Sequence, residues 1–244
     1  MKPTDISKGM VLLLSATSLT HAAILPDRTR LILNQGDKSI SLRLSNKSPT
    51  LPYLAQSWIE DQTGVKNRDY ISTVPPLVRL EPGEQTQVRL MGLPALARLP
   101  SDRESLFYYN VREIPPRSEG QNVVQIAMQS RLKLFWRPKA IRLNSGQPLP
   151  WKSIKLSRTE NGLHFMNSTP YHMTIGYVGI DGKTLLKGTT SLMLVPFSEQ
   201  TLPVKDLPSQ FQVGYIGDFG GLNLFKISCN AVQRECSSQP AQKD

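Results

Sequence analysis

The sequence Val-Val-Gln-Ile-Ala-Met-Gln-Ser-Arg-Leu-Lys-Leu-Phe-Trp, residues 123–136, alternates apolar and polar side chains over much of its length. Because successive side chains of a β-strand point to opposite faces, this stretch predicts one strand, longer than the usual length of about 3–10 residues. Shorter runs with the same period recur elsewhere, for example at residues 39–44 and 106–111, with turn residues between them. After residue 22, no segment of ten or more residues shows sustained helical periodicity. The sequence therefore predicts an all-β fold made of β-sandwiches.

The length of 244 residues fits two sandwiches of about 100 residues each. The break between them falls between Pro138 and Pro150, a stretch rich in proline, glycine and asparagine. We assign residues 23–141 to an N-terminal domain and residues 142–236 to a C-terminal domain. Residues 237–244 are polar and predict a tail outside the second domain.

The first 22 residues differ from the rest of the chain. A charged start with Lys2 and Lys8 precedes a short apolar run at residues 10–14. Mostly small residues follow up to Ala22, and this order is typical of a secretory signal peptide. The apolar run is far shorter than the roughly 20 residues that span a bilayer. An ordinary buried N-terminal helix is the alternative. No later segment is apolar enough to insert into a membrane, so we expect an exported, soluble protein that begins at Ala23.

The formal net charge of +10 is common among nucleic-acid-binding proteins. Predicted export and the lack of a polybasic cluster argue against a nucleic-acid partner, and a basic surface that meets an anionic peptide or membrane face fits better. The two cysteines, Cys229 and Cys236, predict one disulfide that closes a small loop. No metal site is predicted, because two cysteines need further ligands and His164 and His172 lie far upstream.

No catalytic motif stands out. The sequence lacks a Gly-x-Ser-x-Gly elbow, a P-loop, a dinucleotide fingerprint and a His-Glu-x-x-His helix. A Ser-His-Asp set would have to use His164 or His172, which we interpret as structural. Paired carboxylates far apart in the chain stay open, without a local motif to support them. We therefore predict a binding protein without a cofactor rather than an enzyme.

Within residues 123–136, Val124, Ile126 and Met128 share one face. These side chains either pack in the core of a sandwich or lie exposed near an edge, ready to pair with a strand of a partner. Spacing alone favours the core and cannot decide between the two.

Six segments of the first domain, in their order along the chain, resemble the periplasmic chaperones of the chaperone/usher pathway, which assemble pili. They are Asp-Arg-Thr-Arg (27–30), Leu-Pro-Tyr-Leu-Ala-Gln (51–56), Arg-Leu-Glu-Pro-Gly (79–83), Asp-Arg-Glu-Ser-Leu-Phe-Tyr (102–108), Arg-Glu-Ile-Pro-Pro-Arg-Ser-Glu (112–119) and Lys-Leu-Phe-Trp-Arg-Pro (133–138). The second domain resembles the family more loosely, at residues 167–171 and 198–200 and in the cysteine pair. The short link between Glu113 and Gln125, with a turn at residues 117–122, is similar to the short-loop branch, whose clients build rod-like pili.

The resemblance implies two immunoglobulin-like sandwiches arranged as a boomerang. It also implies that Val124, Ile126 and Met128 form a strand lent to an incomplete pilus subunit, which replaces the core interpretation favoured by spacing. Such β-augmentation combines main-chain hydrogen bonds with apolar side chains that fill a groove. Arg30 and Lys133 would anchor the C-terminal carboxylate of the subunit.

Further implied roles concern the domain arrangement and the partners. Glu104, Arg137 and Asp218 would form a salt-bridge network between the domains. A surface patch would face an outer-membrane usher; its residues are Pro52, Leu54, Pro75, Pro76 and Arg89. The partners would be pilus subunits (pilins) and the usher, the location would be the periplasm, and no cofactor would be needed. Because an unoccupied apolar strand edge promotes association, we also expect that the free protein can self-associate through its exposed strand.

A secreted adhesive immunoglobulin module is the main alternative, with Asn46 and Asn167 as glycosylation sites. The usual Cys…Trp…Cys arrangement is missing, since both cysteines lie at one end of the chain. A hydrolase is the third class considered, and no assembled catalytic set supports it.

Overall fold

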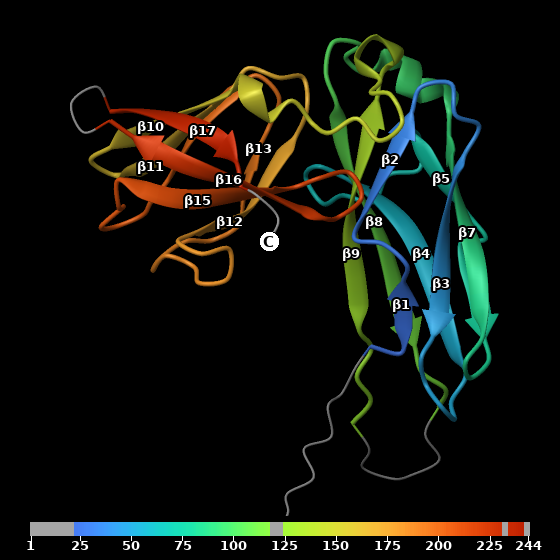
Figure 1. Ribbon diagram of the computed structural model, residues 1–244. Helices are drawn as coiled ribbons and strands as arrows, with labels where there is room; N and C mark the ends of the chain where they lie inside the picture. The colour runs from blue at the N-terminus through green and yellow to red at the C-terminus, as the bar shows by residue number, and fades with distance from the viewer. Residues whose placement is uncertain (1–21, 118–123, 231–233, 242–244) are drawn as a thin grey trace, which may run out of the picture.

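The computed structural model describes residues 22–117, 124–230 and 234–241. Figure 1 shows two β-structured units that meet at an angle, one built from β1–β9 and the other from β10–β17. Each unit has its own buried hydrophobic cluster, one drawn from residues 24–136 and the other from residues 149–229. The chain is therefore divided into two separately packed parts, as the length and the linker composition predict.

The N-terminal unit is a sandwich of two sheets. The first sheet runs in the order β1 (Ile24–Pro26), β3 (Ile40–Asn46), β7 (Gln85–Gly92) and β5 (Ile71–Val74). The second runs in the order β2 (Arg30–Asn34), β9 (Gln129–Arg137), β8 (Ser105–Ile114), β4 (Tyr53–Asp61) and β6 (Leu77–Leu80). The pair β2–β9 is parallel, and the other pairs are antiparallel. A 3-10 helix, η1 (Pro94–Arg98), follows β7.

Alternating side chains of the two sheets fill the space between them. On β8, Phe107, Tyr109 and Val111 are buried, while Arg112 on the opposite face is exposed. The hydroxyl of Tyr109 lies 2.7 Å from the Ser57 hydroxyl inside the core, and burial raises the pKa of Tyr109 to about 12. The buried phenol is thus neutral and hydrogen-bonded, as a buried polar group requires.

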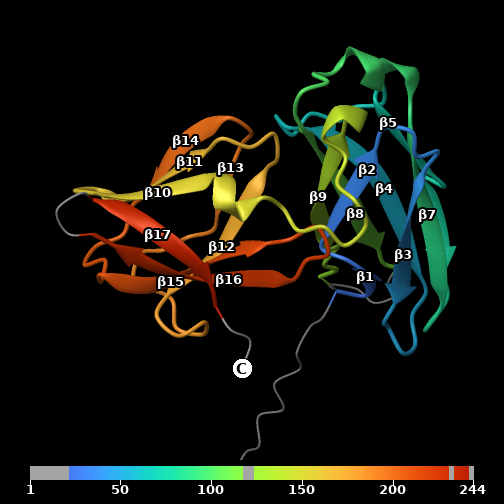
Figure 2. The same cartoon turned by 45° about the horizontal axis from the view of Figure 1, so that its top comes forward.

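The strands of the C-terminal unit form one continuous hydrogen-bonded sheet. Its order is β13 (Leu192–Leu194), β12 (Met173–Gly179), β15 (Gln210–Ile216), β16 (Leu222–Cys229), β17 (Glu235–Pro240), β10 (Ile154–Thr159), β11 (Gly162–Asn167) and β14 (Ser198–Leu202). Figure 2 shows β10, β11 and β14 on the opposite side from β15 and β16, so the sheet curves around its core. Two 3-10 helices, η2 (Lys139–Ile141) and η3 (Trp151–Ser153), lie in the connection between the units.

The sequence prediction of a single strand over residues 123–136 is wrong at its start. Strand β9 begins at Gln129, and residues 124–128 belong to no strand; Val123 lies outside the described residues. The partner strand β8 ends at Ile114, and its Glu113 N–H donates to Met128 O at 3.0 Å. Beyond that point β8 provides no further backbone partners. The alternating pattern of the sequence therefore extends past the paired part of the sheet.

The predicted polar tail also needs correction. Residues 237–240 belong to β17, which pairs with β16 from Phe225↔Pro240 to Cys229↔Cys236. Residues 237–240 pair with β16 through the backbone and contribute no large apolar side chain, which is why their polar composition did not indicate a strand. Residues 242–244 lie outside the described residues, as do residues 1–21 of the predicted signal peptide.

The two cysteines form the disulfide Cys229–Cys236, between directly opposed residues of β16 and β17. No helix in the described part of the chain is both long and apolar enough to cross a membrane.

Replacing both cysteines by serine should destabilise the C-terminal unit. In the loop-entropy account, a bridge that closes a loop this short stabilises the fold by about 2–3 kcal/mol. Urea unfolding of the double variant Cys229→Ser/Cys236→Ser would show a lower midpoint than the oxidised wild type. Wild type kept in reductant should shift by a similar amount, and an unchanged midpoint in both samples would contradict the expectation.

Candidate functional site

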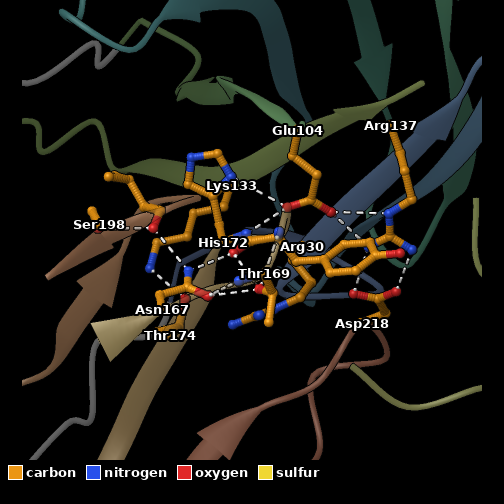
Figure 3. Close-up of polar contacts among 12 residues, drawn as sticks. Arg30, Glu104, Lys133, Arg137, Asn167, Thr169, His172, Thr174, Ser198 and Asp218 are labelled. Carbon is orange, nitrogen blue, oxygen red and sulfur yellow. Dashed lines mark hydrogen bonds and ion pairs between the residues drawn. The ribbon is translucent and has the colours of Figure 1, made fainter. Parts of the chain in front are cut away.

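Two cations from the N-terminal unit face the C-terminal unit. Arg30 on β2 and Lys133 on β9 lie directly opposite each other in the parallel pair. Arg30 Nη1 donates a hydrogen bond to Ile216 O at 2.8 Å, and Lys133 Nζ donates to Thr174 Oγ1 at 3.0 Å. Figure 3 shows both side chains in the region between the units. The strand pairing therefore brings together two positive charges that are about one hundred residues apart in the sequence.

The surroundings of these cations leave them short of negative partners. Burial and the charge of Arg30 lower the pKa of Lys133. Burial also lowers the pKa of Arg30, against the opposing charges of Asp218 and Glu104. The buried Arg30 Nε has no hydrogen-bond partner among the described residues. A buried donor without a partner is costly, so an anion that reached it would be stabilised.

A second charged cluster joins the two units beside this pair. Arg137, at the end of β9, donates through Nε and Nη2 to Glu104 Oε1 at 2.9 and 2.7 Å. Its Nη1 and Nη2 reach the two carboxylate oxygens of Asp218 at 2.8 and 3.1 Å. The side chains of Arg137 and Glu104 are 4% and 1% exposed. Although burial opposes its charge, hydrogen bonds to Asp218 and the charge of Glu104 raise the pKa of Arg137.

His172 completes the cluster from the C-terminal unit. Its backbone N–H donates to Glu104 Oε2 at 2.7 Å, and its Nδ1 lies 3.2 Å from the same oxygen. The ring packs 5.2 Å from that of Phe135. Sequence reasoning assigned His172 only a general structural role and missed its place here. No local signal could have found it, because its partner is 68 residues away.

Next to both clusters is a hollow of about 540 Å³ between the units. Arg30, Arg137 and Asp218 line it together with Phe219, which is 89% exposed at the tip of the β15–β16 hairpin. The described residues contain no group of three or more His, Cys, Asp or Glu side chains that could hold a metal ion.

The exposed apolar residues lie just before β9. Val124 is 86% exposed, Ile126 is 72% exposed and Met128 is 42% exposed. The interpretation from spacing alone, which put this face in the core, is therefore wrong. Side-chain alternation could not reveal this, because a core strand and an exposed extended segment show the same period.

The residues proposed for an usher-facing patch lie on the surface of the N-terminal unit. Pro52 and Leu54 are half-buried at the start of β4, and Arg89 is exposed on β7. Val74 pairs with Arg89 across β5 and β7, which places Pro75 and Pro76 next to that strand. The carbonyl of Pro76 accepts the N–H of Ser57 in β4 at 2.8 Å.

Comparison with known proteins identifies the class. The profile described as "Pili and flagellar-assembly chaperone, PapD N-terminal domain" matches residues 23–142, and "Pili assembly chaperone PapD, C-terminal domain" matches residues 150–224. The chain therefore belongs to the family of pilus-assembly chaperones, which are not enzymes.

Among its relatives, the chain is 51% identical to "Uncharacterized fimbrial chaperone YqiH" of Escherichia coli K12 over 98% of this chain and 97% of the relative. It is 42% identical to "Chaperone protein PapD" of Escherichia coli, covering 86% and 87%.

Solved structures show the same fold of two immunoglobulin-like domains. The periplasmic chaperone SfaE matches with a TM-score of 0.64 at 30% identity, over 82% of this chain and 95% of that chain. A Salmonella enterica structure of the SafA pilin in complex with the SafB chaperone matches with a TM-score of 0.72 at 25% identity, over 86% and 98%.

Arg137→Ala should loosen the junction between the units. Removing one partner of a buried ion pair leaves its carboxylates uncompensated, at a cost of about 3–5 kcal/mol. We expect a lower denaturation midpoint and a broader distribution of shapes by small-angle X-ray scattering. Arg142→Ala is the control, because its contact with Asp37 is half exposed; such a pair contributes about 0–1 kcal/mol. Equal effects of the two substitutions would count against a special role for Arg137.

Proposed function

We propose that this chain caps pilus subunits in the periplasm, lends them residues 124–128 as a missing strand, and delivers them to an outer-membrane usher. One observation carries the proposal: an exposed run of alternating apolar residues leads through β9 directly to the cation pair Arg30 and Lys133. The solved structure of the similar chaperone SafB, in complex with the SafA pilin, supports the proposal.

The exposed segment is suited to β-augmentation. Residues 124–127 form no backbone hydrogen bond to the rest of the described chain, so their N–H and C=O groups are available to a partner strand. Val124, Ile126 and Met128 would enter alternate pockets of a groove on the subunit. Removing these side chains from water supplies the hydrophobic contribution to binding.

The cation pair would anchor the C-terminal carboxylate of the subunit. The unpartnered Nε of Arg30 and the Nζ of Lys133 can both donate to a carboxylate, and charge-assisted hydrogen bonds of this kind are short and strong. Lys133 follows Met128 by five residues, so a fixed carboxylate also fixes which subunit residues face the apolar side chains. A slip by one residue would turn them to the wrong face.

The remaining expectations fit the same function. The ion-pair cluster around Arg137 would hold the angle at which the second domain meets the bound subunit. The patch at Pro52, Leu54 and Arg89, with the two prolines after β5, would meet the usher.

The disulfide and residues 1–22 fit export to the oxidising periplasm. The short link before residue 124 would place the chain in the branch that serves rod-like pili. The same exposed residues would let the free chaperone self-associate.

Arg30→Ala and Lys133→Ala should each weaken pilin capture at least tenfold. A hydrogen bond to a charged group contributes about 1.5–3 kcal/mol, so losing one donor removes at least a factor of ten in affinity. The measurement is the amount of one-to-one complex purified after co-expression with a candidate pilin. Arg28→Ala is the control, because Arg28 is exposed and pairs with Asp27. Normal capture by both Arg30→Ala and Lys133→Ala would show that the assignment of the carboxylate anchor is wrong.

Ile126→Asn should abolish capture without changing the stability of the free chaperone. Ile126 is 72% exposed, so the substitution removes no internal packing. The bound state would lose about 1.5–3 kcal/mol of apolar burial and would have to desolvate an amide. Val65→Asn is the matched control, since Val65 is 61% exposed in a loop outside the segment. Retention of the complex by the Ile126 variant would contradict strand donation.

A further inference from the structure

One carboxylate lies on the inner face of the N-terminal sandwich. Along β8, Phe107, Tyr109, Val111 and Glu113 alternate onto the core-facing side, and Glu113 is only 5% exposed. Removing a carboxylate from water is costly unless hydrogen bonds and a compensating charge accompany it. The position of Glu113 therefore calls for a partner.

Glu113 joins two segments that are far apart in the sequence. Its Oε2 accepts hydrogen bonds from the backbone nitrogens of Ala23 at 2.7 Å and Ile24 at 3.0 Å. Its Oε1 accepts from Met128 N at 3.4 Å, and its own N–H donates to Met128 O at 3.0 Å. Figure 1 shows β1 beside the end of β9 from which residues 124–128 extend. The carboxylate thus connects the start of β1 to the root of the proposed donor segment.

No Lys, Arg or His of the described residues forms an ion pair with Glu113 within 4.0 Å. Arg112, the neighbour of Glu113 on β8, lies over the ring of Trp58. Arg79 on β6 pairs with Glu81. Lys47, which follows β3, and Glu113 form no ion pair within 4.0 Å. Among the described residues the carboxylate is therefore held by backbone hydrogen bonds without an ion pair within 4.0 Å.

We propose that Glu113 is the binding site for the α-ammonium group of Ala23, created when a leader peptidase removes residues 1–22. In that step water adds across the Ala22–Ala23 amide; Ala22 keeps the carboxylate, and the Ala23 nitrogen leaves as an amine that takes up a proton. The inference rests on the predicted processing site and goes beyond subunit binding.

The geometry suits an ammonium group. The distance of 2.7 Å from the Ala23 nitrogen to Oε2 is within the range of charge-assisted N⁺–H···O⁻ hydrogen bonds, about 2.7–2.9 Å. The Ala23 nitrogen is also held in place: Ala23 is 7% exposed, and its carbonyl accepts the Lys47 N–H at 2.7 Å. After cleavage the positive charge would arise at the atom that already touches the carboxylate.

Processing would then affect the donor segment. In the precursor the Ala23 nitrogen is a neutral amide, and the carboxylate that holds Met128 stays uncompensated. In the processed chain an ion pair would fix the position of that carboxylate. Met128, the residue at which the donor segment joins β9, would then be held more rigidly against Glu113.

The test uses the protein purified from the periplasm, with its start checked by intact mass. NMR titration of selectively labelled alanine would follow the Ala23 amine in wild type and in Glu113→Gln. We expect the wild-type pKa to exceed the ordinary 7.7–8.0 by about one unit or more, and the variant to lose this rise. Because the folded-state pKa is raised, the stabilisation is complete below about pH 7.7 and disappears as the pH rises through the raised value.

Two further samples separate the ion pair from simple packing. Inserting one glycine before Ala23 keeps Glu113 but moves the ammonium away, so it should lower the amine pKa and speed amide hydrogen exchange at Met128 several-fold. Glu81→Gln, on the surface, should change neither. A start other than Ala23, or an amine pKa that is equal in wild type, Glu113→Gln and the glycine insertion, would overturn the proposal.

Discussion

The parallel pairing of β2 with β9 is the constraint on which the rest of the structure depends. It sets Arg30 opposite Lys133 and Asn34 opposite Arg137. The middle of β9 thereby carries Lys133 of the cation pair and its end carries Arg137 of the charged junction to the second unit, while its start directly follows the exposed residues 124–128. A shift of this register would separate the two cations and turn the apolar residues of β9 out of the core.

Several features of this fold do not favour its own stability. Two cations lie side by side with a buried donor left without a partner, and large apolar side chains face water. Two well-packed cores and the ion-pair cluster around Arg137 offset these costs. Subunit binding would offset part of these costs, because it would cover Val124, Ile126 and Met128 and bring a carboxylate to Arg30.

Much of the fold followed from alternation and turn residues, because both reflect local backbone geometry. The two-part division was predicted from the length and the composition of the linker, and the disulfide from the presence of two cysteines close in the sequence. The strand ends were not predicted: β9 starts later than the alternating pattern, because β8 stops pairing, and β17 includes the polar residues 237–240, which pair with β16 through the backbone. His172 and the contacts of Glu113 were also missed, because each depends on partners far away in the chain.

By itself the sequence determined the class of fold and, through six motifs, the family. The resemblance to that family also pointed to Arg30 and Lys133, which the structure places opposite each other on β2 and β9. Only the tertiary structure decided whether Val124, Ile126 and Met128 are buried or exposed, and which carboxylates Arg137 joins. The physical reason is that period two fixes which side chains share a face, whereas burial and pairing depend on what the rest of the chain places against that face.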